Sequence, residues 1–129
     1  MELPKVLSLS TDRDLARLRE RAKVLEQAGF DVVSVTSTSQ ALFEIMRGHC
    51  GIFISCPLIS DFSTAEFFKV FKKHCPNGLS VFVMGDEIRS SVYRQQADIQ
   101  VHEAYGPEGI VAAILAHLKM ERRDLADTA

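Results

Sequence analysis

Several polar and reactive side chains stand directly after short apolar runs, at positions where buried strands are expected to end. These residues are Ser10, Thr11, Asp12, Cys56 and Glu103, and Gly85 stands at the corresponding place after the run 79–84. Hydroxyls, a thiol and carboxylates that come together could hold a metal ion, act as a nucleophile or transfer protons. What they do depends on the elements that position them, because they are scattered along most of the chain.

The apolar pattern predicts short strands that alternate with helices, one of each at a time. The strands are expected at 5–9, 31–36, 51–55, 79–84 and 99–101, and the helices at 13–28, between Ser39 and Gly48, before His74, at 88–96 and from Pro107 to Leu118. This alternation indicates a parallel sheet covered by helices on both faces. We therefore expect an α/β fold with a five-stranded parallel sheet, for which we take the common doubly wound order 2-1-3-4-5. The polar residues described above then meet at its carboxyl edge, where open sheets of this kind bind ligands.

Length and charge limit what the chain can be. Its 129 residues fit one domain, since domains usually contain ~100–200 residues. We expect this domain to span 1–120, with a polar tail at 121–129 that frays. The chain contains 15 Lys and Arg residues and 17 Asp and Glu residues, which gives a net charge of −2. No overall positive charge therefore favours direct nucleic-acid binding.

The remaining composition points to a cytoplasmic protein. No apolar run approaches the ~20 residues that a membrane helix needs, and no signal-peptide pattern is present at the N-terminus. The three cysteines, at positions 50, 56 and 75, form no CxxC pair, which is typical of reduced thiols rather than of a disulfide framework.

From about Lys5 to Leu118 the chain resembles the receiver domain of bacterial two-component response regulators. The segment CPLISDFSTAEFF stands where that family has its acceptor aspartate, a proline-containing turn and a helix. The segment ADIQVHEAY resembles the family's alanine–aspartate, strand and lysine–proline–aromatic run. The resemblance implies a (βα)5 receiver-like domain with a role in phosphorelay signal transduction.

The residues that receiver phosphorylation requires are replaced in this chain. The resemblance places the two acidic residues after the first strand on Ser10 and Thr11, and the acceptor aspartate on Cys56. It places the hydroxyl residue after the fourth strand on Gly85 and the lysine after the fifth strand on Glu103. We therefore interpret the chain as a degenerate receiver, or pseudo-receiver, that is not an enzyme.

A divalent cation would find few ligands in such a pocket. Mg²⁺ is usually bound by one or two carboxylates together with water and phosphate. Asp12 is the carboxylate that remains after the first strand, and at a helix N-cap its side chain points toward the helix amides. Glu103 puts a negative charge where a phosphoryl group needs a positive one. We expect no metal, no cofactor and no phosphorylation at Cys56.

The function that we expect is therefore protein–protein interaction that does not depend on phosphorylation. The resemblance implies a contact face formed by the fourth helix, the fifth strand and the fifth helix. We assign Val92, Tyr93 and Tyr105 to this face. The expected partner is a histidine kinase or another signalling protein, and homodimerisation through the same face is the other arrangement, since symmetric pairing is the commonest assembly.

A redox or small-molecule sensor that uses the neutral pocket around Cys56 stays open as the alternative. Cys56 lies near the start of a helix, where a thiolate can be stabilised. The sequence offers only His102 as a cation beside it.

Two further patterns have structural explanations. The basic residues Arg13, Arg17, Arg19, Arg21 and Lys23 indicate a solvated helix face. Phe67, Phe68 and Phe71, at helical spacing, indicate core packing rather than a ligand site.

Overall fold

The computed structural model describes residues 3–10, 15–48, 50–56, 64–84 and 97–127, which form strands, α-helices and one short 3₁₀ turn. The strands are β1 (Val6–Leu9), β2 (Val32–Val35), β3 (Ile52–Ser55), β4 (Leu79–Met84) and β5 (Ile99–His102). The helices are α1 (Leu15–Gln27), α2 (Thr38–Met46), α3 (Thr64–His74) and α5 (Gly106–Asp127), with the turn η1 (Glu103–Tyr105) before α5. The expected helix at 88–96 lies outside the described residues.

The five strands form one parallel sheet of order β2-β1-β3-β4-β5, as the sequence predicted. Leu9 at the end of β1 pairs with Val35 of β2 and with Ser55 of β3. The three strands therefore end level with one another, and the residues that follow β1 and β3 emerge side by side.

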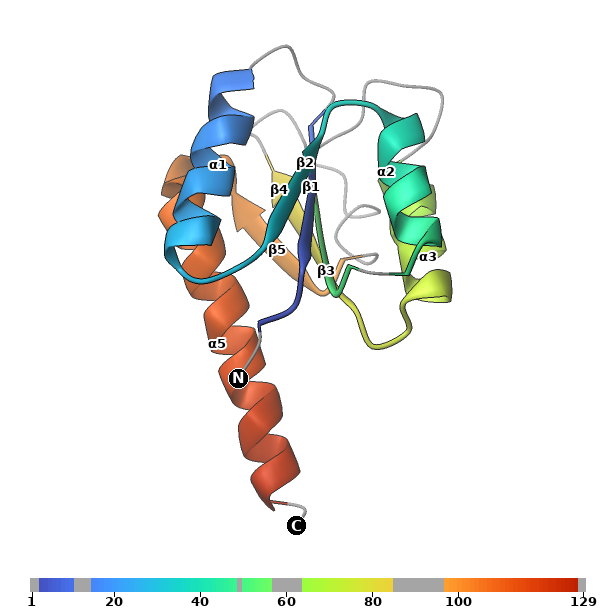
Figure 1. The fold of residues 1–129 in the computed structure, drawn as a ribbon. Coiled ribbons are helices and arrows are strands. Elements are labelled where there is room, and N and C mark those ends of the chain that lie inside the picture. The colour runs from blue at the N-terminus through green and yellow to red at the C-terminus, as the bar shows by residue number, and fades with distance from the viewer. Residues whose placement is uncertain (1–2, 11–14, 49, 57–63, 85–96, 128–129) are drawn as a thin grey trace.

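Helices cover both faces of the sheet. Figure 1 shows α1 and α5 together on one face and α2 and α3 on the other. Alternate strand residues supply two apolar layers: Val6, Ile52 and Ile54 face α1 and α5, whereas Leu7 and Phe53 face α2 and α3. Because both faces are buried, the strands are almost continuously apolar.

The phenylalanines of α3 lie in the core, which confirms the interpretation of their spacing. Phe67, Phe68 and Phe71 are 3%, 1% and 0% exposed. The ring of Phe53 in β3 lies 5.5 Å from the rings of both Phe68 and Phe71, within the range of favourable aromatic pairs. These side chains fix α3 against the centre of the sheet.

The last helix is longer than predicted. Residues 121–127, which we expected to form a polar tail, continue the helix to Asp127. Residues 119–127 contain neither glycine nor proline, and Lys, Met, Glu, Arg and Leu are good helix formers. A helix already nucleated on the sheet therefore continues outward, and Figure 1 shows its end projecting beyond the sheet. No helix in the described part of the chain is long and apolar enough to cross a bilayer.

A polar cluster joins α3 to the amino ends of β4 and β5, opposite the carboxyl edge. The carboxylate of Asp98 accepts hydrogen bonds from the Ser80 amide at 2.9 Å and the Ser80 hydroxyl at 3.1 Å, and the Lys72 ammonium lies 2.5 Å away. Burial alone would raise the pKa of Asp98, but the bonds from Lys72 and Ser80 outweigh it and hold the pKa below its ordinary value of 3.8. The folded state therefore favours the ionised carboxylate.

Asp98→Asn should lower the free energy of unfolding by about 1–2 kcal/mol at pH 7, because it removes the ion pair and one charged acceptor. A carboxylate with a lowered folded pKa stabilises the protein above its unfolded pKa and loses that contribution as pH falls through the folded pKa. The difference from wild type, measured by urea unfolding, should therefore be complete at pH 7 and shrink below about pH 4.

Asp31→Asn is the matched control for this experiment. Asp31 also precedes an edge strand, but its side chain is exposed. An equal loss of stability in the two variants, or a difference that does not change with pH, would contradict the role given to Asp98.

Candidate functional site

The structure brings Ser10 and Cys56 together at the carboxyl edge of the sheet. They follow the paired residues Leu9 and Ser55, and the Cys56 amide lies 3.5 Å from the Leu9 carbonyl oxygen. Ser10 is 5% exposed, and its amide donates a hydrogen bond to the Val35 carbonyl oxygen at 3.2 Å. Cys56 is only partly buried, so its sulfur lies at the boundary between the sheet and the surface.

Arg21 of α1 completes this group of residues, and sequence reasoning missed it. Its guanidinium is buried, with 6% of the residue exposed. Nη1 donates a hydrogen bond to the Ser8 hydroxyl at 3.1 Å, and Nη2 donates to the Cys56 sulfur at 3.1 Å. The expectation of a solvated basic face is therefore wrong for Arg21.

The spacing of α1 contained a signal for this position. Leu18 and Leu25 are the other buried residues of the helix, and Arg21 lies three residues after the first and four before the second. These intervals place it on the buried stripe of an α-helix. Ser8 gave a matching signal, because it is a fully buried hydroxyl within an otherwise apolar strand.

Among the residues that the structure describes, the buried Arg21 guanidinium is hydrogen-bonded to a hydroxyl and a sulfur rather than to a carboxylate. Removing a cation from water is costly unless acceptors or an anion compensate for it. In the described part of the chain, the acceptors of its hydrogen bonds are the hydroxyl of Ser8 and the sulfur of Cys56. Neither of these two acceptors is a carboxylate.

A second arginine of α1 meets Glu103, the first residue of η1. Arg17 Nη1 lies 3.2 Å from Glu103 Oε2, and their side chains are 63% and 47% exposed. An exposed pair of this kind contributes only about 0–1 kcal/mol. Arg17 and Arg21 are four residues apart and so share one side of α1. That side therefore meets both the end of β3 and the turn after β5.

His102, which the sequence offered as a cation beside Cys56, has another contact. Its Nδ1 accepts a hydrogen bond from the Ala104 amide at 3.0 Å and caps η1. The cation at the Cys56 sulfur in this structure is Arg21.

The other residues predicted for the site divide into two groups. Tyr105, at the end of η1, is 74% exposed, as a residue of a contact face would be. The remaining ones, Thr11, Asp12, Gly85, Val92 and Tyr93, lie outside the described residues, so their roles stay predictions. Within the described ranges, no three His, Cys, Asp or Glu side chains lie together as a metal site.

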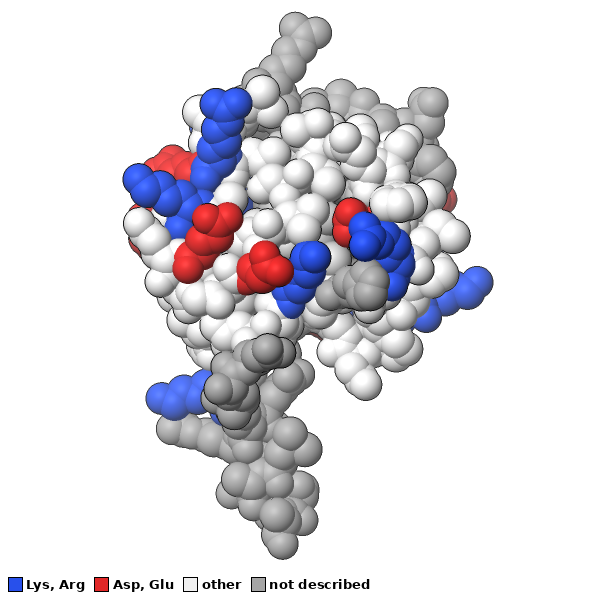
Figure 2. Space-filling view, viewed as in Figure 1, with Lys and Arg blue, Asp and Glu red and all other residues white. Residues whose placement is uncertain are grey.

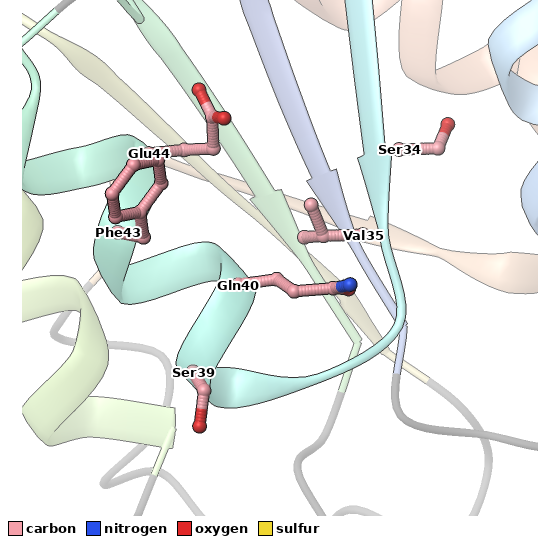
Figure 3. A pocket seen from close by; sticks show the side chains of 6 residues that line it. All are labelled: Ser34, Val35, Ser39, Gln40, Phe43 and Glu44. Atoms are coloured by element: carbon pink, nitrogen blue, oxygen red, sulfur yellow. The ribbon is translucent and has the colours of Figure 1, made fainter.

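A cleft of about 360 Å³ lies away from these residues, between α2 and the edge strand β2. Figure 3 shows Gln40 reaching from α2 toward β2, and its amide oxygen accepts a hydrogen bond from the Thr36 amide at 3.2 Å. The lining residues are Ser34, Val35, Ser39, Gln40, Phe43 and Glu44. None of the predicted site residues that the structure describes lines this cleft.

Known proteins are similar to this chain in structure rather than in sequence. No protein-family model matches the sequence, and no curated protein matches it. The fold matches a CheY-like response regulator receiver domain from Methanospirillum hungatei JF-1, with a TM-score of 0.81 and 19% identity over 95% of this chain and 99% of that one. It also matches a receiver domain from Clostridium thermocellum, with a TM-score of 0.75 and 15% identity over 93% and 98% of the two chains.

A third similar structure is the BeF₃-activated receiver domain of DrrB, with a TM-score of 0.76 and 16% identity over 92% of this chain and 99% of that one. Together with the strand order and the helices on both faces, these matches show that the chain has the fold of response regulator receiver domains. At the carboxyl edge of this sheet, the Arg21 guanidinium contacts the Cys56 sulfur.

The bond between Arg21 and Ser8 leads to a testable coupling. Ser8→Ala removes an acceptor from a buried guanidinium and should lower the free energy of unfolding by about 1–3 kcal/mol. In an Arg21→Met background the cation is absent, so the same change should cost much less. A double-mutant cycle by urea unfolding measures this difference. Strictly additive effects of the two substitutions would contradict the contact.

Proposed function

We propose that this chain acts in signal transduction as a degenerate receiver that binds another protein independently of phosphorylation. The receiver fold supports the general role, and the residues at the carboxyl edge support the loss of phosphorylation. The partner in this proposal is a signalling protein such as a histidine kinase, or a second copy of the chain.

The observation that carries the proposal is the Arg21 guanidinium, 3.1 Å from the sulfur of Cys56. The resemblance to receivers places the acceptor aspartate at this sulfur. A fixed cation beside it opposes entry of Mg²⁺ by charge repulsion, and a thiol replaces the hard oxygen ligand that Mg²⁺ prefers. The proposed site therefore has neither a carboxylate at the acceptor position nor a favourable place for the metal.

Glu103 supports the same proposal from the far side of β4. It stands where the resemblance places the phosphate-binding lysine, and its carboxylate faces Arg17. A carboxylate at this position would repel a phosphoryl group rather than bind it. In the described part of the pocket, the charge of Glu103 is thus paired with Arg17 of the same chain.

The proposed contact face is supported by apolar side chains on η1 and α5. Tyr105 is 74% exposed, Leu115 40% and Met120 65%. Tyrosine and methionine are enriched in protein interfaces, and β5 lies beside this region as an edge strand of the sheet. Figure 2 shows basic and acidic side chains interspersed over α1. Such a mixed surface favours protein partners over nucleic acid.

Incubation with Mg²⁺ and a small phosphodonor should leave the intact mass of the protein unchanged. A phosphoryl group would add about 80 Da, and a receiver with an intact acceptor aspartate serves as the positive control. A stoichiometric, stable adduct of that mass on this chain would contradict the proposal.

The contact face is tested by Tyr105→Ala, with Phe43→Ala as the matched control, because Phe43 is also exposed at 62% but lies on α2. Truncating an interface aromatic should weaken binding about tenfold or more, since such anchors often contribute above ~1.4 kcal/mol. Self-association is measured by sedimentation equilibrium, and partner binding by retention on the immobilised variants. Binding that survives Tyr105→Ala, or that requires the phosphodonor, would contradict the proposal.

A further inference from the structure

The three cysteines of the chain have different surroundings. Cys50 is 3% exposed, and burial together with the charge of Glu44 raises the pKa of its thiol. Burial also raises the pKa of Cys75. Both groups are therefore held in the protonated form, which is a poor nucleophile. Cys56 is partly exposed and is the cysteine with a guanidinium within hydrogen-bond distance in the described part of the chain.

The guanidinium is held in place by the fold. Arg21 is 6% exposed, and its Nη1 is fixed by the fully buried Ser8 hydroxyl while Nη2 points at the Cys56 sulfur. An N–H donor on a cation binds an ionised acceptor more strongly than a neutral one. Because no side-chain movement is needed to form this contact, the site is arranged in advance for a negatively charged sulfur.

We propose that Cys56 is a peroxide-sensitive thiol whose reactivity is set by Arg21. This proposal goes beyond the proposed function and does not depend on it. The ionised sulfur attacks one oxygen of hydrogen peroxide, so that an S–O bond forms as the O–O bond breaks. The sulfur is oxidised by two electrons and the peroxide is reduced. The leaving hydroxide takes the proton lost by the thiol, which gives one sulfenic acid and one water.

The product should persist because the other two thiols lie across the sheet. Cys56 packs against the layer formed with α1 and α5, whereas Cys50 and Cys75 belong to the layer formed with α2 and α3. A sulfenic acid is usually consumed by a nearby thiol that forms a disulfide with it. With the sheet between them, neither thiol can reach Cys56 within one folded molecule. The new oxygen remains beside the Arg21 guanidinium as an additional acceptor.

The test treats the reduced full chain with hydrogen peroxide in the presence of dimedone, which traps sulfenic acids, and follows the three cysteine peptides by mass spectrometry. Cys56 should be labelled at least about tenfold faster than Cys50 and Cys75. This comparison needs no substitution and so does not depend on how a variant folds. Faster labelling of Cys50 or Cys75, or no labelling of Cys56, would overturn the proposal.

The role of Arg21 is tested separately with Arg21→Met. This variant keeps much of the buried volume but removes the cation, and it should slow the labelling of Cys56 about tenfold. Arg19→Met is the matched control, because Arg19 lies on the same helix with an exposed side chain, and it should leave the rate unchanged. Circular dichroism checks that both variants are folded. An unchanged rate in folded Arg21→Met, or an equal loss in both variants, would show that Arg21 does not set the reactivity.

Discussion

The hydrogen bonds of Arg21 constrain the position of α1 on the sheet. The guanidinium reaches Ser8 in β1 and Cys56 after β3, so one side chain connects the helix to these two neighbouring strands. A buried hydroxyl in a strand is costly unless it is hydrogen-bonded, and a buried cation is more costly still. Any other register of α1 would leave both groups without these partners. The same register places Arg17, one turn earlier, against Glu103.

The fold could be predicted from the sequence because its dominant signal is local. Runs such as 51–55 and 79–84 are mostly apolar, which is typical of strands buried on both faces, and apolar residues recur at helical intervals in the intervening segments. The elements follow from that alternation, and the strand order is the one that the resemblance to receiver domains implies. The length of α5 is not predictable in this way, because residues 119–127 are mostly polar and lack the apolar stripe of a helix that packs on a core. Polar residues with high helix propensity extend a helix that is already formed.

The site was predictable only in part. The pairing of the sheet fixes where the strands end, but it does not determine which partners the long side chains of the helices reach. Ser10 and Cys56 were expected to be neighbours because parallel strands end at one edge, and they are. Arg21 was hidden in a basic run that resembles a solvated helix face, and its burial depends on Ser8 and on Cys56, 35 residues away. Glu103 pairs with an arginine 86 residues away. No local sequence pattern specifies contacts between residues that are so far apart in the sequence.

The two proposals share one electrostatic argument. A pocket lined by carboxylates is negative until a divalent cation enters, so its state depends on an exchangeable ion. In this chain the cation at the edge of the sheet is a side chain of α1, which the fold holds in place and which cannot dissociate. Under the two proposals, a signal at this edge acts by chemical change at the sulfur that faces Arg21, and not by loading or removing a divalent cation. Binding that is independent of phosphorylation and oxidation of that sulfur are therefore compatible properties of one site.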